Sequence, residues 1–295
     1  MERNQLKYVI EVARHENITH AAEVLHLAQP SLSNQILKLE QELGVSLFER
    51  SRKRVYLTEA GKNFVYQAKQ ILNSMEQLEK DMKDYAARRM GSIQIGALPT
   101  MVSLGIPDII TKFRDKYRTL EITLREMGSS KLYQSVQIGE LDVAFAILDH
   151  DFPDEEIHRI KLMESDLVAV INTANPLSKQ KELSINSLKD QHIISSSSDF
   201  SFPSFYLTPL HQQNIPYMVS SICNQIESVF ALVEKNFGIT FCSKETSRHY
   251  PSKNIVYIPI RDMPSRKIYL IYKKSPEYHP TLQAFIDFVL KCYDI

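Results

Sequence analysis

Residues 18–61 have the sequence ITHAAEVLHLAQPSLSNQILKLEQELGVSLFERSRKRVYLTEAG, and this stretch decides the fold of the N-terminal part of the chain. It predicts two short helices that meet at a turn, followed by a basic hairpin. The second helix has one apolar face and one face of small and polar residues, as does a helix that lies in a groove of DNA. The stretch therefore predicts a winged helix-turn-helix.

Each of the two helices is expected to bury one face. In the first, from about Ile18 to Leu27, apolar residues recur with helical spacing at Ile18, Ala21, Ala22 and Leu25. The second begins near Pro30, which suits the first helical position because no hydrogen bond is lost there. Gly44 is expected to end it as a left-handed cap. Its apolar face is formed by Leu32, Ile36, Leu39 and Leu43.

The exposed side of the second helix carries the side chains expected to contact DNA. An amide can bond adenine with two hydrogen bonds, and a hydroxyl can bond a base or a phosphate. These residues, the recognition set, are Gln29, Pro30, Ser31, Ser33, Asn34 and Lys38.

The hairpin that follows is expected to be a basic wing. Arginines there suit a narrow minor groove and its phosphates. A polar helix face alone is usually a surface, and a charge cluster alone is usually a solvated loop, so the prediction rests on the two features together. The wing set consists of Arg50, Arg52, Lys53 and Arg54.

Composition limits the other possibilities. A chain of 295 residues with 43% hydrophobic residues buries large cores and divides into two or three units. The net charge is zero, so charge alone does not indicate a nucleic-acid binder, and the local basic cluster outweighs that average. Cys223, Cys242 and Cys292 suit a reducing cytosol and are each expected to be small buried hydrophobes. No signal peptide or long apolar run is present, which predicts a cytoplasmic protein without a membrane partner.

Residues 59–87 are expected to form one long helix with Thr58 as its N-cap. Apolar residues recur at alternating steps of four and three from Phe64 to Tyr85. A helix packed on its own domain is one explanation, but the period of 3.5 favours a coiled coil with a second chain. The dimerisation seam is predicted to consist of Phe64, Ala68, Ile71, Met75, Leu78 and Met82.

From Gly91 onward, predicted strands alternate with predicted helices, which indicates an α/β fold with largely parallel sheets. Strands are expected at 92–98, 120–127, 141–148, 166–171, 192–195, 217–222, 238–242, 254–260 and 266–273. Helices are expected at 106–117, 130–139, around 184–190, 203–214, 224–236 and 279–293.

The first 61 residues resemble the LysR-type transcriptional regulators of bacteria. The pieces AA-x-x-L, QPSLS-x-Q-I, LE-x-ELG, LFER and LTEAG stand at that family's spacing, and the likeness continues more loosely through the whole chain. One departure is Asn34, where the family often carries a longer basic residue, and it bears on which base is read. The resemblance implies that the long helix joins two DNA-binding heads.

For the C-terminal half, the resemblance implies an effector domain similar to periplasmic solute-binding proteins. Two Rossmann-like subdomains would be joined by crossovers near 161–165 and 262–267. The expected division is a DNA-binding domain, a linker and dimerisation helix, and an effector domain, at 1–58, 59–90 and 91–295. Within the last, subdomain I would comprise about 91–162 and 266–295, and subdomain II about 163–265.

The effector is expected in a cleft between the subdomains, where polar residues follow the strand ends. A small anionic metabolite is the expected ligand. For a single hydroxyl, a helix cap or turn residue is the alternative explanation. The effector set consists of Thr100, Met101, Ser129, Ser130, Ser196, Ser197, Ser198, Phe202 and Gln225.

The sequence predicts no catalytic residue, metal site or cofactor. It contains no G-x-S-x-G, P-loop, dinucleotide fingerprint or HExxH. The clustered histidines His15, His20 and His26 are spaced five and six apart, off one helix face, and are expected to be surface residues. We predict a ligand-responsive DNA-binding regulator, with a cytosolic binding module without DNA function, or an enzyme, as the alternatives. Expected partners are an operator with dyad symmetry, a second copy in a dimer or tetramer, the effector, and RNA polymerase.

Overall fold

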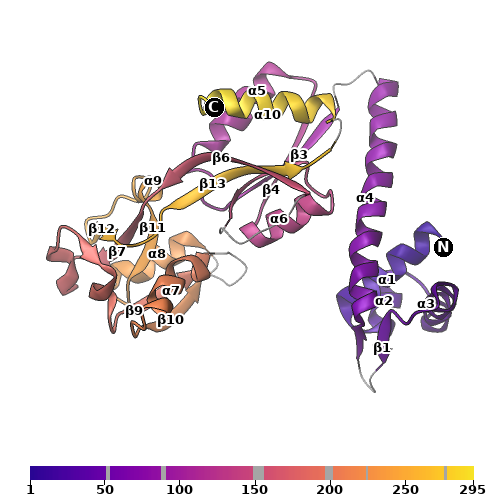
Figure 1. The fold of residues 1–295 in the computed structure, drawn as a ribbon, viewed down its shortest axis with the longest axis horizontal. Coiled ribbons are helices and arrows are strands. Elements are labelled where there is room, and N and C mark those ends of the chain that lie inside the picture. The colour runs from indigo at the N-terminus through magenta and orange to yellow at the C-terminus, as the bar shows by residue number, and fades with distance from the viewer. Residues whose placement is uncertain (51–53, 88–90, 149–155, 197–201, 224, 276–277) are drawn as a thin grey trace. The chain divides into compact units, whose positions relative to one another are not determined.

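The computed structural model describes residues 1–50, 54–87, 91–148, 156–196, 202–223, 225–275 and 278–295 (Figure 1). It forms two compact units. The first comprises Met1–Arg89 with Ile138–Glu140, and the second Met90–Gln137 with Leu141–Ile295. The first unit contains the predicted helix-turn-helix and long helix, and the second contains the predicted α/β half.

Three helices build the head, residues 1–58: α1 (Arg3–His15), α2 (Ile18–Val24) and α3 (Gln29–Leu43). The Asn17 side chain caps α2 by accepting hydrogen bonds from the N–H groups of Thr19 and His20. Helix α2 ends three residues before the predicted Leu27, because His26 takes a positive φ of 55°. The predicted start of α3 and its left-handed cap at Gly44, with φ 70°, are confirmed.

The predicted apolar faces form the core of the head. Ala21 and Ala22 of α2 pack with Leu32, Ile36 and Leu39 of α3, and with Val9, Val12, Leu47 and Phe48. Leu43 was predicted to share this face, but it is 38% exposed. It is the last residue of α3, and the chain reverses at Gly44 before the core can cover it.

The wing is an antiparallel hairpin of β1 (Phe48–Arg50) and β2 (Val55–Leu57), as predicted. The long helix α4 (Glu59–Ala87) follows, and Thr58 Oγ1 caps it by accepting a hydrogen bond of 2.9 Å from the Gly61 N–H. Gly61 allows a close approach here, because a Cβ atom would lie 2.0 Å from the carbonyl oxygen of Leu47. The first turn of α4 is therefore packed directly against the chain entering the wing.

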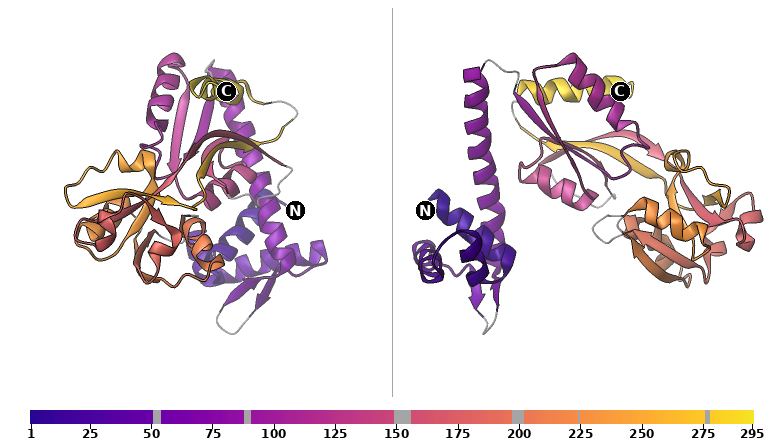
Figure 2. Two further views of the ribbon diagram at one scale, coloured as in Figure 1. Left: turned by 60° about the vertical axis from the view of Figure 1, so that its left-hand side comes forward. Right: turned by 180° about the vertical axis from the view of Figure 1, so that it is seen from behind.

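The second unit contains a five-stranded sheet in the order β4-β3-β5-β13-β6. Strand β3 pairs in parallel with β4 and β5, whereas β13 is antiparallel to β5 and β6. Helices α5 and α10 lie on one face of the sheet and α6 on the other (Figures 1 and 2). The elements are β3 (Ser92–Ala97), α5 (Ile106–Lys116), β4 (Glu121–Glu126), α6 (Ser129–Gln137), β5 (Val143–Ile147), β6 (Ile157–Ser165), β13 (Arg266–Lys273) and α10 (Pro280–Cys292).

A second group of strands has the order β11-β7-β12-β8, and a parallel pair, β9 and β10, is joined to it by a bridge between Ile193 and Ile239. Its strands are β7 (Leu167–Asn172), β8 (Leu183–Ser184), β9 (His192–Ser196), β10 (Met218–Cys223), β11 (Thr240–Ser243) and β12 (Ile255–Arg261). Its helices are η1 (Pro176–Lys179), η2 (Ile185–Leu188), α7 (Phe202–Gln212), α8 (Ile226–Glu234) and α9 (Lys244–Ser247).

The predicted α/β class is confirmed, but the prediction of largely parallel sheets is wrong. Strand β13 returns from the second group of strands and therefore enters the first sheet against the direction of β5. Strand β6, which was not predicted, occupies the whole of the crossover expected at 161–165 and pairs with β13 as far as Ser165 and Arg266. The helix expected around 184–190 is a single 3₁₀ turn, η2.

Candidate nucleic-acid interface and effector site

The exposed face of α3 carries the recognition set. Gln29, Pro30, Ser31, Asn34 and Lys38 are exposed, and Ser33 is half-buried. On the opposite face, Leu32, Ile36 and Leu39 are almost completely buried, which fixes the rotation of the helix about its axis. No acidic residue lies in the first turn of α3. This end of the helix therefore offers amide and hydroxyl groups without a carboxylate that would repel phosphate.

Glu40 of α3 attaches the helix to the wing. Its Oε1 atom accepts hydrogen bonds from the backbone N–H groups of Leu47, at 2.7 Å, and Phe48, at 3.1 Å. The carboxylate thus satisfies two donors at the start of β1. The Glu40 side chain thereby connects the recognition helix to the start of the wing.

Of the wing set, Arg54 is the residue whose side chain the structure describes. Its Nη1 atom lies 3.5 Å from Glu16 Oε2, and its side chain is 65% exposed. Arg50 ends strand β1, and nothing is described of its side chain. Arg52 and Lys53 lie outside the described residues. Arg54 also borders a surface hollow of about 400 Å³.

Two of the three histidines expected on the surface are brought together. The Nδ1 atoms of His15 and His20 lie 3.0 Å apart, and His15 Nε2 lies 3.4 Å from Glu11 Oε2. His15 is therefore half-buried, in contrast to the prediction, because the turn between α1 and α2 folds one ring onto the other. In the part of the chain that the structure describes, no group of three or more His, Cys, Asp or Glu side chains has the geometry of a metal site.

The seam on α4 is divided into two parts. Phe64 and Ala68 pack against the head, Ala68 against Leu6 of α1. This is the packing of a helix on its own domain. The remaining four residues, Ile71, Met75, Leu78 and Met82, are between 38% and 61% exposed. The second part of the seam is thus an exposed apolar stripe.

The effector set in the first sheet is partly occupied by structural contacts. Ser129 begins α6 and is buried, and its Oγ accepts a hydrogen bond of 3.1 Å from the Ile147 N–H at the end of β5. Ser130 is exposed. Thr100 is half-buried in the turn after β3, and Met101 packs against the core of this sheet. Ser130 is therefore the most exposed member of this group, and Thr100 is partly accessible.

In the second group of strands, the ends of β9 and β10 lie side by side. Ser196 pairs with Cys223 at those ends, and Gln225 is exposed just before α8. Phe202 begins α7, but its side chain and that of Ser196 are not described, and Ser197 and Ser198 lie outside the described residues. Ser195, one residue earlier, is buried with its Oγ 3.0 Å from the Tyr206 hydroxyl.

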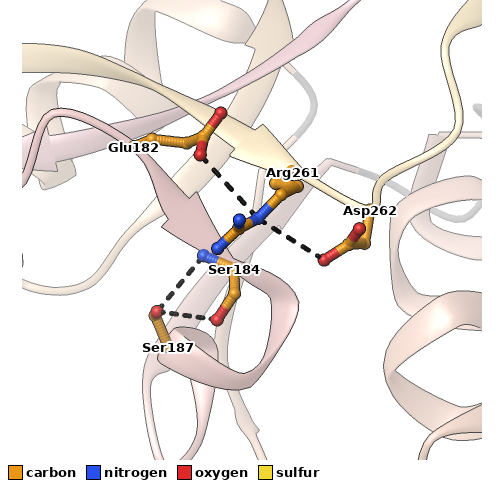
Figure 3. Close-up of polar contacts among 5 residues, drawn as sticks. All are labelled: Glu182, Ser184, Ser187, Arg261 and Asp262. Atoms are coloured by element: carbon orange, nitrogen blue, oxygen red, sulfur yellow. Dashed lines mark hydrogen bonds and ion pairs between the residues drawn. The ribbon is translucent and has the colours of Figure 1, made fainter.

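Arginines near the crossovers were not singled out from the sequence. Arg266 is the one buried charged side chain among the described residues, at 7% exposure, and it pairs along the backbone with Ser165. Ser165 Oγ donates to Glu245 of α9. Arg261, by contrast, is exposed, with Nε 3.7 Å from Glu182 Oε2 and 3.9 Å from Asp262 Oδ2 (Figure 3). Two carboxylates therefore lie beside the Arg261 guanidinium at the surface.

The cysteines differ in environment. Burial raises the pKa of the Cys242 thiol to about 12, against a smaller opposing effect of Arg266. Cys242 is thus the small buried hydrophobe that was predicted. Cys223 is half-buried and Cys292 is exposed, so the prediction is wrong for Cys292, which ends α10 on its open side.

Two family models match this chain. The model described as LysR substrate binding domain matches residues 86–292, and the model described as bacterial regulatory helix-turn-helix protein, lysR family, matches residues 3–62. The chain belongs to the LysR family. The predicted family and its winged helix-turn-helix, long helix and α/β effector domain are thereby confirmed.

Similar proteins span the whole length of this LysR-family chain. The transcriptional dual regulator GltC of Bacillus subtilis is 28% identical over 99% of this chain and 98% of its own. The Hca operon transcriptional activator HcaR of Escherichia coli is 29% identical, with 98% and 97% covered. The crystal structure of CbnR, a LysR family transcriptional regulator, shares the fold with a TM-score of 0.69 at 21% identity, covering 99% of both chains.

This LysR-family member is a ligand-responsive, DNA-binding transcriptional regulator. Its relatives are transcriptional regulators as well. None of the described helices is both long enough and apolar enough to cross a membrane.

Proposed function

We propose that this regulator acts in the cytoplasm, binds an operator with dyad symmetry as a dimer or tetramer, contacts RNA polymerase, and responds to a small anionic metabolite. The working parts are residues 1–58 for DNA, 59–90 for dimerisation and 91–295 for the effector. The observation that carries the proposal is the exposed face of α3. It presents Gln29, Ser31 and Asn34 on the side of the helix opposite its buried apolar face. This function needs no catalytic residue, metal or cofactor.

The DNA-binding proposal uses the recognition set for base contacts and the wing set for phosphate contacts. It is supported by the two hydrogen bonds through which Glu40 connects α3 to the wing. A gel shift with the DNA upstream of the chain's own gene tests it, with a scrambled duplex as competitor. A specific complex that survives the scrambled competitor is expected. Equal competition by both duplexes would contradict sequence-specific binding.

The proposal of a dimer rests on the exposed part of the seam. Four large apolar side chains on one helix, Ile71, Met75, Leu78 and Met82, lose contact with water when a second copy packs against them. Two heads joined in this way span half-sites separated by whole turns of the DNA helix. The dyad symmetry of the operator then follows from the symmetry of the dimer.

The proposal of an effector site rests on polar groups at strand ends: Thr100 after β3, Ser129 and Ser130 at α6, Ser196 to Ser198 after β9, and Gln225 before α8. Met101 and Phe202 would supply apolar contact. The expected anionic class rests on the start of α6, where Ser129 and Ser130 lie and where the N–H groups of a first helical turn attract anions. Thermal-shift screening of carboxylates against neutral analogues tests this, because a ligand at about 100 times its Kd adds about 2.7 kcal/mol to the free energy of unfolding. Stabilisation by neutral compounds alone would overturn the anionic class.

A further inference from the structure

Glu16 has an unusual backbone conformation. It ends α1 in the left-handed region with φ 49°, which glycine adopts freely and glutamate rarely does. Its carbonyl oxygen accepts a hydrogen bond of 3.0 Å from the N–H of Val55, the first residue of β2. The backbone of Glu16 therefore holds the base of the wing.

The side chain of Glu16 reaches the same part of the wing. Its Oε2 atom lies 3.5 Å from Arg54 Nη1, and the two side chains are 48% and 65% exposed. An exposed ion pair at this distance is weak, so a DNA phosphate can replace the carboxylate. Both residues border the surface hollow, together with Arg14, His15 and Asn17, which leaves room for a phosphate beside Arg54.

Resting on the proposed DNA contact of the wing, we propose that Glu16 is an internal competitor for DNA phosphate at Arg54. It positions the arginine in the free protein and lowers the affinity of the wing for any DNA sequence, because Arg54 has to leave Glu16 before it neutralises a phosphate. The second arginine of the hollow, Arg14, has a carboxylate of its own, with Nη1 3.7 Å from Glu11 Oε1. Glu16 therefore acts on Arg54 in particular.

A double-mutant cycle on the full-length chain tests this competition. Fluorescence anisotropy with a duplex of arbitrary sequence, between about 50 and 200 mM salt, compares wild type, Glu16→Gln, Arg54→Ala and the double variant. We expect Glu16→Gln to bind about threefold to tenfold tighter at the lowest salt. The slope of log affinity against log salt should steepen by about 0.9, the value for one phosphate contact. In the Arg54→Ala background, Glu16→Gln should change neither quantity.

Two further variants keep the test decisive. Glu42→Gln makes the same charge change on the last turn of α3, where the partner is the N-terminal amine at 2.8 Å, and it should leave the slope unchanged. Glu16→Gly removes the carboxylate but suits the left-handed backbone, and it should reproduce Glu16→Gln. An equal gain from Glu42→Gln, a gain that persists in the Arg54→Ala background, or unchanged or weaker binding by both Glu16 variants would overturn the inference. A wild-type chain that binds no duplex at all would instead overturn the DNA-binding function.

Discussion

At the scale of single residues, Asn34 provides the most direct test of base recognition. It lies on the open face of α3 among hydroxyl groups, and an asparagine amide pairs with an adenine edge through two hydrogen bonds. We expect Asn34→Ala to lose about 1–3 kcal/mol of discrimination at one base position of the operator, while binding to unrelated DNA stays the same. Binding measurements on a set of single-base operator variants check this.

The control for Asn34→Ala is the thermal stability of the variant. Because its side chain is exposed, thermal unfolding of Asn34→Ala should differ from wild type by no more than about 0.5 kcal/mol. A uniform loss across all duplexes would instead place Asn34 on the phosphate backbone.

The cysteines offer a second test at the residue scale. With a pKa of about 12 and a buried position, the Cys242 thiol should resist iodoacetamide at pH 8, whereas the exposed Cys292 should react. The raised pKa also has a consequence for stability. The folded state favours the neutral thiol of Cys242. Its contribution to the free energy of unfolding is therefore complete below the ordinary thiol pKa and is lost as pH rises toward about 12. Mass spectrometry of the labelled chain gives the pattern, and labelling of native Cys242 as fast as Cys292 would contradict its burial.

At the scale of elements, the exposed stripe of α4 is the test of assembly. We expect Met75→Asp with Leu78→Asp to dissociate the proposed dimer, because each chain would bury two carboxylates without partners in the interface. Light scattering measures the mass. The matched control places the same two charges beside the stripe, with Gln67→Asp and Ser74→Asp, both at exposed positions, and should leave the dimer intact. An unaltered mass for the stripe variant would move the interface to another surface.

The same elements show what a sequence does and does not predict. Helices α3 and α4 were predictable because their period of apolar residues is local, and the caps at Gly44 and Thr58 mark their ends. Strand β6 was not predictable, because its pairing with β13 shifts by one residue between Ile268 and Tyr269. Leu162 has no partner at this irregularity, so the alternation of buried and exposed residues along the strand changes phase there. The exposure of Leu43 was not predictable either, because the period of a helix does not show where the elements packed against it end.

The candidate sites also differ in how far the sequence predicts them. The recognition set comes from consecutive turns of one helix, so the periodicity that predicts the helix also predicts which residues are exposed. The pairs Glu16 with Arg54, His15 with His20 and Ser165 with Glu245 join different elements. Only the tertiary fold creates such contacts. The effector set is equally hard to predict from the sequence, because its hydroxyl groups follow different strands. Ser129, moreover, already accepts a backbone hydrogen bond.

At the scale of the whole molecule, regulation requires that effector and DNA binding change one another. A ligand shifts a regulator only by its differential affinity for two states, and the coupling is reciprocal. Thr100 is half-buried in the turn after β3, and valine keeps its shape without its hydroxyl. We therefore expect Thr100→Val to retain the fold and the DNA affinity of the ligand-free protein, and to bind the effector about 0.5–1.5 kcal/mol more weakly.

Two measurements check the Thr100 prediction once screening has identified the effector. Calorimetry gives the change in effector affinity, and a gel shift titrated with effector gives the response. Because only the affinity is reduced, the full response should return at an effector concentration higher by about twofold to thirteenfold, the factors that correspond to 0.5 and 1.5 kcal/mol. Ser130→Ala, at an exposed position on α6, provides a comparison within the effector set. Equal effector affinity in wild type and Thr100→Val would move the ligand contacts to the other strand ends. A response that stays reduced at saturating effector would instead mean that Thr100 acts on the equilibrium between the two states.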